Sequence, residues 1–139
     1  MELYKLTVHE AADLIDKKEV TYQQIVQSAL QQINEVDKDV KAFVTLADEG
    51  AVKGARQLDD SKADQDVSSA LAGIPFGVED NICTEGIRTT CASRMLSNFV
   101  PPYSATVVSR IARQRGILMG KLNTFVFSMG STTETSYFH

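Results

Sequence analysis

The sequence contains 139 residues, 43% of them hydrophobic and 23% charged, with a formal net charge of −4 at pH 7. This size and composition are typical of one globular domain, and the scattered basic residues exclude a surface that binds nucleic acid directly. Because no apolar run approaches the roughly 18 residues needed to cross a bilayer and the N-terminus lacks a signal-peptide pattern, we expect no membrane contact and a cytoplasmic location.

Two helices are predicted near the start of the chain, each opened by a capping box. Thr7 and Glu10 stand three residues apart before apolar residues at helical spacing, which predicts a helix over residues 8–17. Thr21 and Gln24 repeat the capping pattern. The following apolar stripe predicts a longer helix whose core face is formed by Tyr22, Ile25, Val26, Ala29, Leu30, Ile33 and Val36.

A short buried strand is predicted at residues 42–46, followed by a third helix over residues 47–60. Gly50 and Gly54 weaken that helix, because glycine in a helix interior costs about 1 kcal/mol relative to alanine. The polar residues 61–69 are predicted to form a solvated loop. We therefore expect the part of the chain before residue 70 to be mainly helical.

The second part of the chain, residues 70–139, has the pattern of a strand, a helix and a second strand. The predicted strands are residues 74–78 and 117–119. Ser104 is predicted to cap the intervening helix, whose inward residues would be Val107, Val108, Ile111 and Ala112. Strands connected in this way pair in parallel with a right-handed crossover. The sequence therefore predicts an α/β fold in a single domain over residues 1–139.

Polar side chains follow both predicted strands, and the ends of strands are where α/β proteins carry their chemistry. Glu79 and Asp80 follow the first strand. Neighbours in an extended segment point to opposite faces, so this pair does not predict two carboxylates that share a proton. Lys121 lies in residues 120–123, after the second strand, and lacks the upstream glycine spacing of a phosphate-binding P-loop.

The two cysteines, Cys83 and Cys91, do not predict a metal centre. No further cysteine or histidine pair stands near them in the sequence to complete a zinc site, and free thiols are typical of a reducing compartment. We therefore expect two half-buried thiols, no metal and no cofactor.

A longer and more specific pattern extends through most of the chain. It consists of GIPFGVEDNI at residues 73–82, Thr84, Gly86, TTCAS at 89–93, FVP at 99–101, ATVV at 105–108, GKLN at 120–123, Met129, Gly130, Ser131 and TETS at 133–136. This pattern resembles the N-terminal part of the amidase signature family, and within it the A subunits of glutamyl-tRNA(Gln) amidotransferases.

The resemblance implies an α/β/α fold with a large mixed sheet, of which this chain holds only a portion. It also implies a ligase system of protein biosynthesis, in which the A subunit hydrolyses glutamine to supply ammonia for forming Gln-tRNA(Gln). Its partners would be B- and C-type subunits, and tRNA binding belongs to a partner. The family's amidase site is a Ser, cis-Ser, Lys triad, and Met129, Gly130 and Ser131 match residues that line its substrate cleft.

The sequence departs from the family at its catalytic positions. Glu79 stands where the family has the catalytic lysine, and a carboxylate cannot replace an amine that exchanges protons with two serines. Both serines of the family lie beyond the last residue of this sequence. The usual Met-Asp-Glu after Asn123 is replaced by Thr124, Phe125 and Val126. We expect Glu79 to be solvated and without function.

Three hypotheses follow, and whether the chain is an enzyme stays open at this point. The chain is a diverged relative of the A subunit that is inactive alone, a docking module that binds B- or C-type subunits without catalysis, or one half of a split amidase completed by another chain. Because few strands of the family's sheet are present, exposed strand edges also predict self-association.

Overall fold

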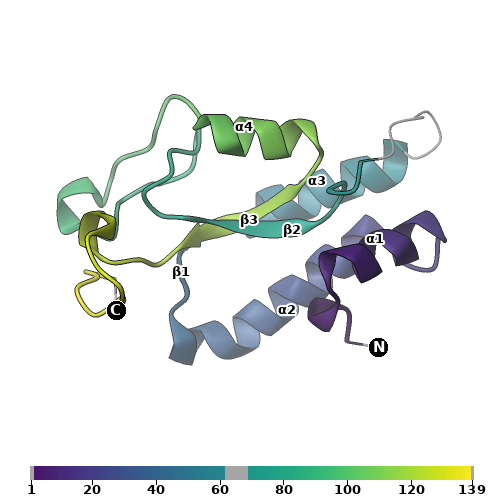
Figure 1. Ribbon diagram of the computed structural model, residues 1–139, viewed down its shortest axis with the longest axis horizontal. Coiled ribbons are helices and arrows are strands. Elements are labelled where there is room, and N and C mark those ends of the chain that lie inside the picture. Colours follow the sequence, from purple (N-terminus) through teal and green to yellow (C-terminus); the bar gives the residue numbers. More distant parts are fainter. Residues whose placement is uncertain (1, 62–68, 139) are drawn as a thin grey trace.

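The computed structural model describes residues 2–61 and 69–138, and most of the predicted loop at residues 61–69 lies outside this part of the chain. Three strands form one mixed sheet, in the order β1-β3-β2 (Figure 1). The strands are β1 (Phe43–Leu46), β2 (Pro75–Glu79) and β3 (Ile117–Leu122). The helix α4 (Thr106–Arg113) lies on one side of this sheet and α2 (Tyr22–Val40) on the other (Figure 1). This is the predicted α/β fold.

The N-terminal helices form as their capping patterns predict. In α1 (Val8–Asp16) the Thr7 hydroxyl accepts a hydrogen bond from the Glu10 amide, and the Glu10 carboxylate accepts one from the Thr7 amide. Thr21 and Gln24 make the same pair of bonds at the start of α2. Each box satisfies amides that the first helical turn would otherwise leave unpaired. The helix α2 continues four residues beyond Val36, the last residue of the predicted stripe.

Two apolar clusters join these helices to the sheet. The larger contains Val26 and Leu30 of α2, Ala51 and Ala55 of α3 (Asp48–Ser61), and Ile117 and Met119 of β3. The smaller joins Ala11 and Ile15 of α1 to Ile25 of α2 and to Ile74, the residue before β2. The predicted core face of α2 is therefore confirmed from Tyr22 to Ile33, whereas Val36, the last residue of the predicted stripe, is exposed. No helix in residues 2–61 or 69–138 is both long and apolar enough to cross a membrane.

Strand β3 is longer than predicted, because it pairs on both sides. It runs parallel to β2 and antiparallel to β1, with Thr45 of β1 opposite Lys121. Residues 120–122 were expected to follow the strand, but they are part of it. Gly120 permits the close pairing with β1, since a Cβ atom at this position would overlap the Thr45 carbonyl oxygen. As a consequence Lys121 lies inside the sheet, where it is 0% exposed.

Three local predictions are wrong. Ser104 does not cap α4, whose N-cap is Ala105 without a side-chain bond; the Ser104 hydroxyl instead accepts a hydrogen bond from the Glu85 amide at 2.9 Å. Val107 and Ala112 were expected to face inward, yet both are exposed, and Val108 is the buried residue of the helix. Because α4 has only eight residues, few of its side chains can pack against the sheet. Strand β1 is half-buried rather than buried, because it lies at the edge of the sheet.

Candidate functional site

Glu79, the last residue of β2, accepts hydrogen bonds from two hydroxyl groups. Its Oε1 atom accepts from Oγ1 of Thr124 and from Oγ of Ser128, the latter at 2.8 Å. Asn81 Nδ2 donates to the same Ser128 oxygen at 2.8 Å. We call these four residues the Glu79 network. Glu79 is half-buried, so its side chain is partly exposed and also hydrogen-bonded within the fold.

The hydroxyl groups keep the Glu79 carboxylate ionised. The hydrogen bond from Thr124, followed by that from Ser128, holds the pKa of Glu79 below its ordinary value, although partial burial opposes this shift. Within the described residues no lysine or arginine forms an ion pair with Glu79. Arg88 instead donates to the Val44 carbonyl at 2.7 Å and to the Thr45 hydroxyl at 3.1 Å.

Asp80 is enclosed and has partners separate from those of Glu79. It is 0% exposed, and its Oδ2 atom accepts from the Thr90 amide at 3.0 Å, from the Thr90 hydroxyl and from the Ala92 amide at 3.3 Å. The other oxygen, Oδ1, is buried without a partner among the described residues. Two adjacent carboxylates thus serve two different hydrogen-bond networks.

Lys121 donates only to uncharged oxygens. Its Nζ atom bonds to the Ile82 carbonyl, to Thr84 Oγ1 at 3.2 Å and to Thr89 Oγ1 at 3.0 Å. Burial lowers the pKa of Lys121 below its ordinary value, and the nearby Asp80 carboxylate partly offsets this effect. We call Asp80, Lys121 and the three threonines at positions 84, 89 and 90 the buried polar cluster.

Two pairs of residues adopt left-handed backbone conformations beside these networks. Cys91 and Ala92 have φ values of 52° and 54°, and Phe127 and Ser128 have values of 53° and 56°. The pairs are connected, because the Phe127 amide donates to the Cys91 carbonyl at 2.9 Å. Residues with a Cβ atom rarely adopt this conformation, and it often occurs at functional sites. Sequence reasoning missed both pairs, because no glycine marks them.

Met129, Gly130 and Ser131, which match cleft-lining residues of the family, directly follow the second left-handed pair. All three are exposed, and Met129 is 80% exposed. A Cβ atom on Gly130 would lie 2.5 Å from the Phe125 ring, so the ring packs closely against the Gly130 backbone. The structure therefore brings these residues to the same end of the sheet as the Glu79 network.

The cysteines are half-buried free thiols, as predicted. The Cys83 thiol lies 3.6 Å from the Tyr103 hydroxyl, and burial raises the pKa of the Cys91 thiol. Across residues 2–61 and 69–138 the structure contains no group of three or more cysteine, histidine or carboxylate side chains arranged to hold a metal.

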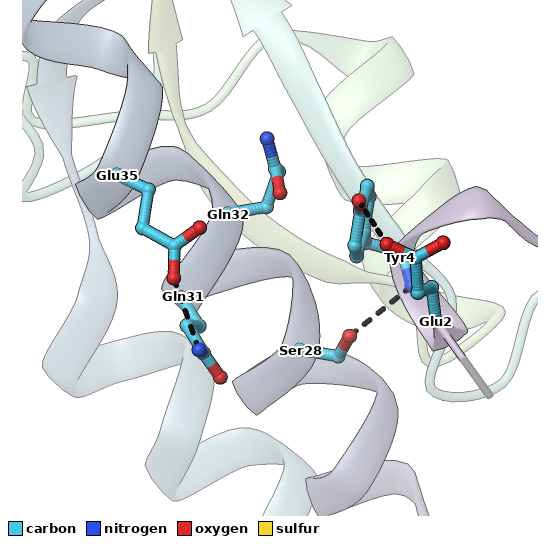
Figure 2. Close-up of a pocket in the computed structure, with 6 residues that line it drawn as sticks. All are labelled: Glu2, Tyr4, Ser28, Gln31, Gln32 and Glu35. Carbon is cyan, nitrogen blue, oxygen red and sulfur yellow. Dashed lines mark hydrogen bonds between the residues drawn. The ribbon is translucent and has the colours of Figure 1, made fainter.

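A polar pocket of about 280 Å³ lies elsewhere, between the 3-10 turn η1 (Leu3–Lys5) and α2 (Figure 2). Its lining residues are Glu2, Tyr4, Ser28, Gln31, Gln32 and Glu35. Several of them bond to one another: Tyr4 donates to Ser28 through its amide and to Glu2 through its hydroxyl, and Gln31 donates to Glu35. None of the residues selected from the sequence lines this pocket.

Comparison with known proteins decides the family. The Amidase family model matches residues 24–139. The chain belongs to the amidase family. It is 46% identical over 138 residues to the A subunit of the Moorella thermoacetica glutamyl-tRNA(Gln) amidotransferase, and 48% identical to that of Syntrophomonas wolfei. Each match covers 99% of this chain and 28% of the relative, so the chain spans little more than a quarter of these relatives' length.

Solved structures of amidase-family members share the fold. A protein described as part of a vestigial complex related to an s-triazine catabolic enzyme matches with a TM-score of 0.90 at 26% identity, covering 96% of this chain and 29% of that chain. The A subunit of the Thermotoga maritima glutamyl-tRNA(Gln) amidotransferase matches with a TM-score of 0.73 at 33% identity, covering 98% of this chain and 26% of that chain. The resemblance noted from the sequence motifs is therefore confirmed for the family and the fold.

Proposed function

We propose that this chain is the N-terminal portion of a glutamine-hydrolysing amidase unit of the amidotransferase A-subunit type, and that it does not hydrolyse glutamine on its own. The identity to A subunits extends over nearly the whole chain, which supports this branch of the family. On this proposal the chain works in the cytoplasm, its partners are B- and C-type subunits, and it binds no tRNA by itself.

The hydrogen bonds of Glu79 are the main support for the proposal that the chain is inactive on its own. The resemblance places the catalytic lysine at this position, where an amine would donate to one serine and exchange its proton. Here the carboxylate accepts from Thr124 and Ser128, and its lowered pKa makes it a weak base. An ionised acceptor cannot replace an ammonium donor. Of the triad that the resemblance implies, the lysine is thus replaced and both serines are absent from the 139 residues.

An ammonia-release assay tests this proposal. The purified chain should release no ammonia from glutamine above background, because members of a catalytic triad act as a unit and none of the three is present. The assay is run with the chain alone and with B- and C-type amidotransferase subunits added. Turnover that persists through purification and disappears in Glu79→Ala would contradict the proposal, since it would show a catalytic role for the carboxylate.

A docking or split-enzyme role is the second candidate, and exposed apolar side chains favour it. Met95, Met129 and Tyr137 are 83%, 80% and 54% exposed, and they lie on segments that contact each other, since the Tyr137 amide donates to the Ala92 carbonyl at 3.0 Å. Exposed apolar groups gathered in this way are typical of a surface that another polypeptide covers. A neighbouring reading frame that encodes a Gly- and Ser-rich continuation would favour a split amidase over a docking module.

Self-association is expected from the edges of the sheet. The strand order leaves β1 and β2 each paired on one side only within the described residues, and the unpaired backbone groups of an edge strand can bind another strand. Sedimentation velocity should show dimers or larger species whose fraction grows with concentration. A single monomer boundary at tens of micromolar would show that the edges are protected.

A further inference from the structure

The segment after β3, residues 124–138, is held to the fold mainly by polar contacts. Phe127, Met129 and Tyr137 are exposed, whereas Thr124 and Ser136 are the side chains of this segment that are buried. Ser136 donates to the Asn123 side chain at 2.6 Å. Because apolar burial contributes little here, the conformation of the segment depends on its hydrogen bonds.

The Glu79 carboxylate closes a short loop within this segment. Thr124 and Ser128 stand four residues apart, and both donate to the same Oε1 atom. Between them the chain turns through the left-handed pair Phe127 and Ser128, a conformation that side chains with a Cβ atom oppose. Ser128 is further fixed by the bond from Asn81. The anchors of this turn therefore come from the end of β2 and from the Cys91 carbonyl.

We infer that Glu79 is a positioning residue: its carboxylate holds the turn at residues 124–128 and thereby fixes the backbone that presents Met129, Gly130 and Ser131. The turn ends where these three residues begin, and the Phe125 ring inside it packs against Gly130. The assignment of these residues to a substrate cleft rests on the proposed function, whereas the holding of the turn does not.

The chemistry of the side chain sets a predicted order among variants. Glu79→Gln keeps one carbonyl oxygen that can accept from a hydroxyl, but loses the charge that strengthens such bonds. Glu79→Ala removes the acceptor, and Glu79→Lys replaces it with a donor, so the hydroxyl groups of Thr124 and Ser128 would have to rotate and accept instead. The turn should therefore be held best by glutamate, then glutamine, and least by alanine, whereas lysine could hold it only by reversing the direction of both bonds.

Amide hydrogen exchange on the full 139-residue chain tests the inference. The amides of Phe127 and Tyr137, which bond to the Cys91 and Ala92 carbonyls, report whether the segment is in place. Their exchange should accelerate about tenfold or more in Glu79→Ala, and less in Glu79→Gln. Amides of α2 near Val26 should keep their wild-type rates. Glu85→Lys, a charge reversal at an exposed carboxylate, should change neither set.

A second comparison separates the hydroxyl bonds from general effects of charge. Thr124→Val and Ser128→Ala together should reproduce the faster exchange, and adding Glu79→Ala to them should produce little more, because all three changes remove the same bonds. Unchanged rates in Glu79→Ala, or equal acceleration throughout the chain, would overturn the inference. Ammonia release plays no part in this readout, so a failure of the proposed function leaves the exchange result interpretable, and the reverse also holds.

Discussion

Asp80→Ala is expected to lower the free energy of unfolding by about 3–5 kcal/mol, the range for removing one partner from a buried charged network. The carboxylate is fully enclosed and accepts from the Thr90 amide, the Thr90 hydroxyl and the Ala92 amide. Without it these donors are buried unpaired, and Lys121 loses the anion that favours its charged form. Denaturant unfolding midpoints at neutral pH, with equal slopes in both proteins, measure the difference.

Two further variants make this prediction specific. Asp80→Asn keeps the shape and one acceptor oxygen, so it should cost less than Asp80→Ala but still weaken the cluster. Glu85→Ala removes an exposed carboxylate and should stay within about 0.5 kcal/mol of the wild type. A value for Asp80→Ala inside that same range would mean that the buried network contributes little to the fold.

Sequence patterns predicted the elements that are fixed by contacts between residues close together in the sequence. The capping boxes at Thr7 and Thr21 mark the starts of α1 and α2, because the groups that pair are only three residues apart. The strand-helix-strand pattern likewise predicts the parallel pairing of β2 and β3. The extension of β3 to Leu122 could not be predicted in this way, because it depends on pairing with β1, about 75 residues earlier.

Of the residues in the Glu79 network, the sequence singled out only Glu79 as a candidate site residue. The sequence frame identifies Glu79, but Thr124 and Ser128 lie 45 and 49 residues further on, and no spacing rule connects side chains across that interval. Thr124 was identified only as part of a departure from the family's Met-Asp-Glu, yet it is one of the two donors to Glu79. The sequence did not predict the burial of Lys121, because this burial follows from the extension of β3.

Lys121→Met is expected to lower the free energy of unfolding by about 3 kcal/mol at neutral pH, as for other buried charged groups that lose a partner. Methionine matches the length of the apolar stem, but the Ile82 carbonyl and the hydroxyls of Thr84 and Thr89 lose a charged donor. Asp80 also loses its buried counter-charge. Lys53→Met, at an exposed position of α3, is the matched control and should stay within about 0.5 kcal/mol of the wild type.

The pH dependence of this difference identifies its cause. Burial lowers the pKa of Lys121 in the folded chain, so between that pKa and the unfolded value of 10.5 the unfolded chain binds more protons. The cost of burying the ammonium is fully present below the folded pKa and declines as pH rises toward 10.5. The wild type should therefore gain stability relative to Lys121→Met across this alkaline window, while both share every other titrating group. A difference that stays constant with pH would show that Lys121 is not strained by its burial, and that its three hydrogen bonds fully replace the water it has lost.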